Sequence, residues 1–224
     1  MAKASSKLRA IASLEADTAR AEARLTEERT PAGWGEFNAC VAALRAGGAL
    51  LPGDPPQLTR LGEAAAAVRC TNELWAATAL LCGALDPLPP HALAGLLASL
   101  LSDECVSRPG AGCAYAPSVE ATEALAELLP LAERMDALQA ESSFVVPVAL
   151  SPAFVGLMES WARGATWEQV CADTSLDPGD VARLLRRVAE FAASLKDVPF
   201  LTSSLRASAK EAASLLSRAP IAED

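Results

Sequence analysis

The stretch that decides the fold is SPAFVGLMESWARGATWEQVCADTSLDPGDVARLLRRVAEFAASL, residues 151–195. Its start and stop signals are those of three consecutive helices. Ser151 followed by Pro152 begins the first helix, because a hydroxyl caps exposed N–H groups and proline fits the first turn. Gly164 ends that helix, because glycine tolerates the left-handed turn that closes many helices.

The second and third helices of this stretch have start signals of their own. Thr166 and Gln169 have the spacing of a capping box, in which each side chain satisfies the backbone N–H of the other. Asp177 followed by Pro178 predicts the start of the third helix. The stretch therefore predicts a helix-turn-helix-like C-terminal half.

The third helix has one apolar stripe and one charged face. Arg183, Arg187 and Glu190 fall away from the stripe and are positioned to touch a partner, whereas Arg186 is expected to form an ion pair with Glu190, one turn on. The stripe recurs at helical spacing and must be buried; it consists of Val181, Leu184, Val188, Phe191 and Leu195.

The rest of the chain extends the same helical pattern. Pro130 is expected to kink or split its helix, and the run FVVPVAL at 144–150 is expected to be an extended connector because it contains a proline. A Gly/Pro loop, with room for a short hairpin, is expected at 108–117. Further helices are predicted over residues 5–29, 37–46, 60–69, 72–83, a broad apolar helix after residue 90, 118–138 and 203–216.

The predicted fold class is all-α, a helical bundle with an N-terminal charged helix. Hydrophobic residues make up 51% of the 224 residues but aromatic residues only 4%, a balance that favours close-packed helices over sheets. We expect a charged helical stalk or leader over 1–30, a short helix and a Pro/Gly linker over 31–59, and a bundle over 60–224. Charges or prolines interrupt every apolar run, so no membrane partner is expected.

Charge and reactive residues narrow the function. The net charge of −9 argues against independent nucleic-acid binding. From Arg183 to Lys210, however, the sequence contains six basic residues and two acidic ones, so this segment is locally positive. Six scattered cysteines and the single histidine, His91, lack the spacing of a zinc site, so reduced cysteines in a reducing compartment are expected. The chain has no Gly-Lys dipeptide, hence no phosphate-binding P-loop, and no base for a nucleophile except His91. It is not expected to be an enzyme on its own.

Several segments, in order, resemble one family. These are LGEAAAAVR (61–69) with NELW (72–75), PHALAGLLASLLSDE (90–104), WARGATW (161–167) and LDPGDVARLLRRV (176–188). They resemble the C-terminal helical domain, called DSHCT, of superkiller-type DExH-box RNA helicases. The tail RAPIAE (218–223) is similar to the plant and algal chloroplast branch, which implies a chloroplast location.

The resemblance implies an RNA-guiding role. In that family the bundle lies against the ATPase core, and a "ratchet" helix touches single-stranded RNA as it leaves. The matching RNA-binding positions are Arg187 and Glu104, and Arg183 lies one turn before Arg187. ATP and Mg²⁺ would belong to the DExH core, present in cis or in trans, and no cofactor is expected in this chain. The role requires the side chains of Arg183 and Arg187 to be available to RNA and not to be engaged in ion pairs within the chain.

Two other interpretations stay open. An all-helical protein–protein interaction or scaffold module fits the acidic charge and the Ala/Leu stripes. A DNA-binding helix-turn-helix fits the spacing of 166–195, although Asp180 stands where a recognition helix usually contacts DNA. Trp161 and Trp167 are interpreted as core residues rather than as platforms for nucleic-acid bases.

Overall fold

The computed structural model describes residues 14–22, 33–105 and 111–221, without the side chains of residues 103 and 104. Within these ranges the chain is helical and forms no β-strand, which confirms the all-α class. The elements are α2 (Trp34–Ala46), α3 (Arg60–Ala67), α4 (Glu73–Leu81), α5 (Pro90–Cys105), α6 (Val119–Glu141), η1 (Pro152–Phe154), α7 (Val155–Ala162), α8 (Trp167–Ala172), α9 (Pro178–Ser194), η2 (Leu195–Asp197) and α10 (Ser203–Leu216).

Contacts divide the chain into two units, Met1–Cys40 and Val41–Asp224. In the first unit, residues 14–22 are helical, as predicted for the stalk. The other residues of the predicted 5–29 helix lie outside the described residues. The domain boundaries expected after residues 30 and 59 stay predictions.

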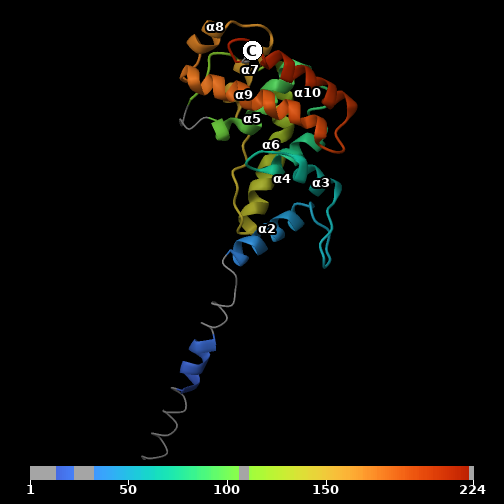
Figure 1. The fold of residues 1–224 in the computed structure, drawn as a ribbon, viewed down its shortest axis with the longest axis vertical. Coiled ribbons are helices and arrows are strands. Elements are labelled where there is room, and N and C mark those ends of the chain that lie inside the picture. The colour runs from blue at the N-terminus through green and yellow to red at the C-terminus, as the bar shows by residue number, and fades with distance from the viewer. Residues whose placement is uncertain (1–13, 23–32, 106–110, 222–224) are drawn as a thin grey trace, which may run out of the picture. The chain divides into compact units, whose positions relative to one another are not determined.

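Helix α5 is the centre of the second unit (Figure 1). It packs against α6, α7, α9 and α10, and its residues 92–102 are all buried or nearly so. Gly95 permits this packing, because a Cβ there would come within 2.8 Å of Val155 Cγ1 on α7. The predicted broad apolar face of this helix is therefore confirmed.

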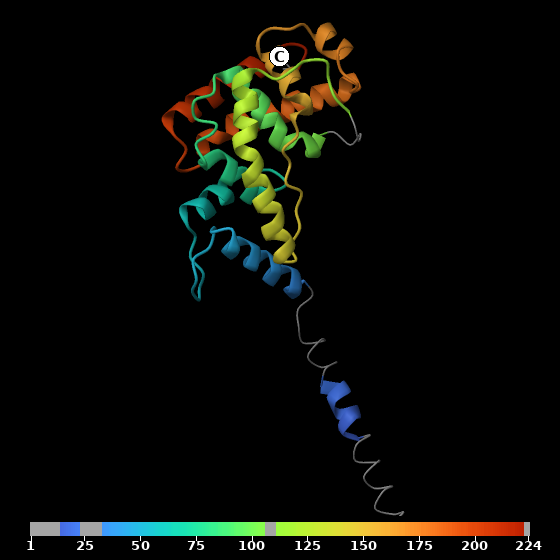
Figure 2. The same ribbon diagram turned by 180° about the vertical axis from the view of Figure 1, so that it is seen from behind.

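Helix α6 runs along the opposite side of the bundle from α9 and α10 (Figure 2). Of the kink or split expected at Pro130, the split does not occur, since α6 is continuous over 23 residues. Pro130 cannot bond to the carbonyl of Ala126, but both residues are exposed, so water can satisfy that carbonyl.

The 144–150 connector is extended, as predicted, and side chains hold it to the bundle. Buried Asn72, the N-cap of α4, donates from Nδ2 to the carbonyls of Val146 (3.3 Å) and Pro147 (3.2 Å). Trp75 Nε1 donates to the carbonyl of Ala149 at 2.7 Å. These bonds satisfy backbone groups that have no strand partner.

The loop that precedes α6 pairs with a distant segment rather than with itself. Cys113 forms an isolated antiparallel bridge with Thr174, and the hairpin considered for 108–117 does not form within its described part. Gly156 on α7 lets this loop approach, since a Cβ there would lie 2.2 Å from the carbonyl oxygen of Tyr115.

The C-terminal half follows its sequence signals closely. Thr166 and Gln169 form the complete capping box at the start of α8. Gly164 ends the preceding helix with a φ of +102°. Asp177 occupies the N-cap position of α9, but its side chain makes no capping hydrogen bond. The predicted apolar stripe of α9 is buried throughout.

Candidate nucleic-acid interface

Helix α9 positions the candidate RNA-binding side chains. Its buried stripe packs against α5 and α10, so its other face, with three arginines and Glu190, is turned outward. Arg183 and Arg186 are exposed, and Arg187 is partly buried. The outward face is thus rigidly held, because seven residues of α9 are buried behind it.

Arg187 lies against the segment that joins α3 and α4. Its Nη2 donates to the backbone carbonyl of Arg69 at 2.6 Å. Its guanidinium carbon is 6.0 Å from the centre of the Phe191 ring. A guanidinium that is held by a carbonyl and an aromatic face loses less side-chain entropy when it binds a further group.

Arg183 lies at the end of α5, beside the turn that carries Glu104. Its Nη1 donates to the carbonyl of Cys105 at 3.3 Å and lies 3.0 Å from Asp180 Oδ1. The Arg183 side chain is still 59% exposed. Glu104 lies in the last turn of α5, one residue before Cys105, and its side chain is outside the described residues. The fold therefore brings the helical turns of Arg183 and Glu104 together, although 78 residues separate Arg183 from Cys105.

The expectation that Arg183 and Arg187 both stand ready for a partner needs correction. Arg183 is ion-paired with Asp180, and Arg187 is anchored to Arg69, so each already has a partner within the chain. Helical spacing places Asp180 one turn before Arg183, so the sequence carries a signal for that pair. It carries none for the carbonyl of Arg69, which belongs to a distant segment. The ion pair of Arg183 lies within one helix and is open to solvent on the arginine side. Such a pair stabilises the fold little, and a phosphate can displace it.

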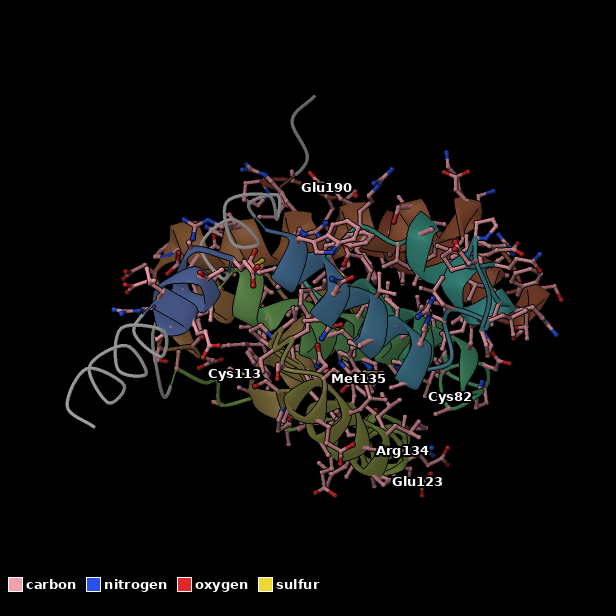
Figure 3. All side chains as sticks on the ribbon, turned by 90° about the horizontal axis from the view of Figure 1, so that it is seen from below. Cys82, Cys113, Glu123, Arg134, Met135 and Glu190 are labelled. Atoms are coloured by element: carbon pink, nitrogen blue, oxygen red, sulfur yellow. The ribbon has the colours of Figure 1, made fainter. Side chains whose placement is uncertain are left out.

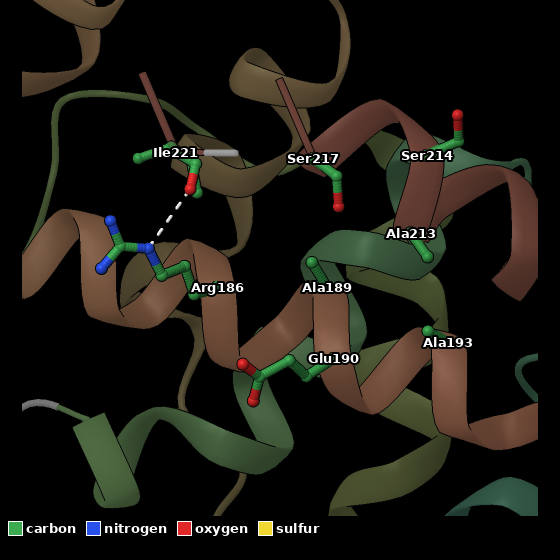
Figure 4. A pocket seen from close by; sticks show the side chains of 8 residues that line it. All are labelled: Arg186, Ala189, Glu190, Ala193, Ala213, Ser214, Ser217 and Ile221. Carbon is green, nitrogen blue, oxygen red and sulfur yellow. Dashed lines mark hydrogen bonds between the residues drawn. The ribbon is translucent and has the colours of Figure 1, made fainter. Parts of the chain in front are cut away.

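The ion pair predicted between Arg186 and Glu190 is also wrong. Arg186 Nε instead donates to the carbonyl of Ile221 at 3.2 Å, and Figure 4 shows its guanidinium directed away from Glu190. The C-terminal segment returns to α9 here and offers a carbonyl that the local sequence does not reveal. Both side chains line a groove of about 610 Å³ between α9 and α10, together with Ala189, Ala193, Ala213, Ser214, Ser217 and Ile221.

A second cavity follows along the same pair of helices, and sequence reasoning did not single it out. It measures about 540 Å³ and shares Ala193 and Ala213 with the first groove. Lys196, Arg206 and Lys210 line it. These residues come from two elements, η2 and α10, so their sequence spacing does not match a motif. The sequence signal for this site is the local excess of basic residues.

Trp161 is a core residue, as expected, and Trp167 is partly buried and packs against the core. Trp161 is fully buried, with its ring centre 6.2 Å from that of Trp167 in an edge-to-face arrangement. Trp161 Nε1 donates to the carbonyl of Leu216 at 3.1 Å, and the guanidinium carbon of Arg218 lies over the Trp161 ring, 3.4 Å from its centre. Arg218 also donates to the carbonyls of Trp161 and Ala165. The cluster ties the end of α10 to α7.

Two cysteines of the bundle, Cys82 and Cys113, carry free thiols. Burial raises the pKa of the Cys82 and Cys113 thiols, which disfavours the reactive thiolate, and Figure 3 shows the two cysteines well apart. Within the described ranges, no group of three or more His, Cys, Asp or Glu side chains has the arrangement of a metal site. Nor does a helix there have the length and apolarity needed to cross a membrane.

The fold and the α9 face define a class of protein: an all-helical domain that carries a fixed basic helix on its surface. Comparison with known proteins identifies the family of this domain. The profile of the DSHCT (NUC185) domain matches residues 56–224, about three quarters of the chain. The chain belongs to the DSHCT domain family.

A curated relative places the domain in a larger context. The chain is 34% identical over 199 residues to the protein named DExH-box ATP-dependent RNA helicase DExH15 chloroplastic, from Arabidopsis thaliana. The match covers 88% of this chain but 17% of that relative, in its C-terminal part. The resemblance inferred from the sequence is thereby confirmed, and the chain is a domain of the kind associated with DExH-box RNA helicases.

Proposed function

We propose that this chain guides single-stranded RNA as the helical module of an ATP-dependent RNA helicase, acting in RNA processing or decay. The ATPase core, with its ATP and Mg²⁺, would be supplied in cis or in trans. Helix α9 would present Arg187 to the strand as the ratchet contact, with Arg183 and Glu104 extending it. The observation that carries the proposal is the fixed position of Arg187 on the outward face of α9.

The chemistry of this face supports the role. A guanidinium can pair with a phosphate or stack on a base, and both contacts are independent of sequence. Arg183 and the turn of Glu104 lie together at the end of α5, so an acceptor and a donor could act on one nucleotide. The net charge of −9 predicts that the isolated chain binds RNA weakly, and that most phosphate contacts belong to the ATPase core.

Replacement of Arg187 tests the proposal directly. In a helicase that contains this domain, Arg187→Ala should lower strand displacement and RNA crosslinking by about tenfold, because one well-placed arginine contact is worth about 1–3 kcal/mol. The matched control is Arg134→Ala, an exposed arginine on α6 that lies on the far side of the bundle from Glu190 of α9 (Figure 3).

The result that would refute the role is equally direct. If Arg187→Ala leaves RNA affinity, unwinding and RNA-stimulated ATPase activity at the level of the Arg134→Ala control, α9 is not the RNA contact. Unfolding curves of both variants should be recorded first, because Arg187 also holds the carbonyl of Arg69.

One observation favours the scaffold interpretation as a second candidate. Trp34 and Phe37 on α2 are 49% and 55% exposed, with ring centres 5.1 Å apart in a stacked arrangement. Exposed aromatic pairs are common centres of protein interfaces. The double variant Trp34→Ala/Phe37→Ala should abolish an RNase-resistant protein complex if this function holds, and should leave RNA crosslinking to α9 unchanged.

We further propose a chloroplast location, on the strength of the name of the Arabidopsis relative. A fluorescent fusion of the complete gene product in plant cells tests it. Fluorescence outside plastids would contradict the proposal.

A further inference from the structure

The cavity at the end of α9 gathers an unusual share of the chain's amines. The whole chain has four lysines, and two of them, Lys3 and Lys7, lie outside the described residues. The other two, Lys196 and Lys210, line one cavity of about 540 Å³ although they come from η2 and α10. Both side chains are exposed.

These two lysines are not neutralised within the bundle. Each lysine is followed in sequence by an acidic residue, Asp197 or Glu211. Among the described residues, neither lysine forms an ion pair with an acidic side chain. Neither acidic residue lines the cavity. Two uncompensated amines therefore meet at one place on a chain whose net charge is −9.

Arg206 removes the negative charge that would otherwise border the cavity. The carbonyls at the end of a helix carry partial negative charge and repel anions. Arg206 donates to the carbonyls of Leu195 (3.4 Å), Lys196 and Val198 (2.5 Å), which end α9 and η2. Three cationic side chains, Lys196, Arg206 and Lys210, line the cavity, and no acidic side chain of the described ranges lines it.

We propose that Lys196 and Lys210 form a second site for the phosphates of single-stranded RNA, apart from the Arg187 contact. An ammonium group binds phosphate as a point charge and needs no fixed geometry, which suits a strand that slides. The alanine methyl groups of the floor can contact ribose and bases. The choice of RNA as the ligand rests on the proposed function, whereas the anion site rests on the cavity and its charges.

The neighbouring groove gives the strand a path. The two cavities share Ala193 and Ala213, and Arg186 lines the far end. From residue 186 to residue 196 the helix axis advances about 15 Å, at about 1.5 Å per residue. A strand held at the lysines can therefore continue along α9 toward Arg186.

The test uses the full 224-residue chain and a fluorescent twelve-nucleotide oligouridylate, with affinity measured by anisotropy at several salt concentrations. Lys196→Ala/Lys210→Ala should bind about tenfold more weakly at low salt. The slope of log K against log salt should fall by about 1.4, because each lost single-strand phosphate contact removes about 0.7. Lys196→Arg/Lys210→Arg keeps the charges and should retain the affinity.

The matched control removes the same two charges elsewhere, as Lys3→Ala/Lys7→Ala. Equal loss of affinity in this control, or no loss in the Lys196/Lys210 variant, overturns the site. A second readout is acetylation of lysines followed by mass spectrometry, in which the oligouridylate should protect Lys196 and Lys210.

Two further comparisons distinguish RNA from an acidic protein segment as the ligand, and this site from the Arg187 contact. If a polyglutamate peptide protects the two lysines better than the oligouridylate does, the groove takes an acidic protein segment and the RNA assignment is wrong. If Arg187→Ala weakens binding while the lysine variant does not, the proposed function stands and this site fails. The reverse pattern supports this site and contradicts the Arg187 contact.

Discussion

At the scale of single residues, the decisive contacts join side chains to backbone carbonyls far away in sequence. Arg187 and its acceptor Arg69 are 118 residues apart, and Arg186 and its acceptor Ile221 are 35 apart. Such bonds fix where a charge sits without consuming an acidic partner. This explains how an acidic chain keeps a basic surface along α9.

Tyr115, the only tyrosine in the chain, offers a clean measurement at this scale. Burial, and then its 2.8 Å hydrogen bond to Asp173, raise the pKa of its phenol from about 10 to about 12. Because the folded state holds this proton more tightly than the unfolded state, the bond stabilises the fold fully below pH 10 and is lost as pH rises through about 12.

We expect ultraviolet absorbance to show the phenol titrating near pH 12, and Asp173→Ala to move this titration toward 10. Asp177→Ala serves as the control, since the Asp177 carboxylate makes no capping hydrogen bond to helix α9 and none to Tyr115. A titration near 10 in the unaltered chain would show that the bond to Asp173 does not form in solution.

At the scale of secondary structure, capping signals located the helices well. The predicted final helix, 203–216, matches α10 residue for residue, and the 37–46 prediction matches α2 except for its first turn. Asn72, the first residue of the predicted 72–83 helix, is the N-cap of α4. Proline was the exception, because its cost depends on whether the freed carbonyl faces water.

Pro130 therefore gives a prediction for α6. Pro130→Ala should raise the free energy of unfolding by about 1–3 kcal/mol. The substitution restores an N–H donor for the carbonyl of Ala126 and introduces a residue with a high helix propensity. Urea denaturation measures the change. Pro152→Ala is the control and should change stability by less than about 1 kcal/mol, since proline is well suited to a first turn. A loss of stability in Pro130→Ala would mean that the packing of α6 needs the proline.

At the scale of the whole molecule, one contiguous core joins elements from Ala49 to Ile221. The joint between α4, α6 and the connector depends on buried Asn72. Its Oδ1 accepts from Trp75 N at 3.0 Å, and its Nδ2 donates to Gln139 Oε1 at 3.3 Å as well as to the connector. One amide thus holds three segments of the chain.

Asn72→Ala should lower the free energy of unfolding by about 3 kcal/mol, because it removes a helix cap and the hydrogen bonds that Nδ2 donates to Gln139 and to the connector. Urea denaturation followed by tryptophan fluorescence measures it, since Trp75 is buried in the same joint. The chain's other asparagine, Asn38, is exposed on α2, and Asn38→Ala should change stability by about 0.5 kcal/mol at most. Equal effects in the two variants would disprove the role of the joint.

The sequence by itself determined the helical class, most helix boundaries, the buried stripe of α9 and the family. These follow from caps and from spacings of three and four residues, which act within one or two turns of chain. Resemblance also indicated Arg187 and Glu104, and helical spacing added Arg183, one turn before Arg187.

Only the tertiary structure decided what surrounds those residues. It set Arg183 against the carbonyl of Cys105 at the end of α5, turned Arg186 to Ile221 rather than Glu190, and brought Lys196 and Lys210 into one cavity. The physical reason is that a charged side chain takes its partner from whatever packs beside it. In this bundle that neighbour often lies tens of residues away, where no local periodicity can reveal it.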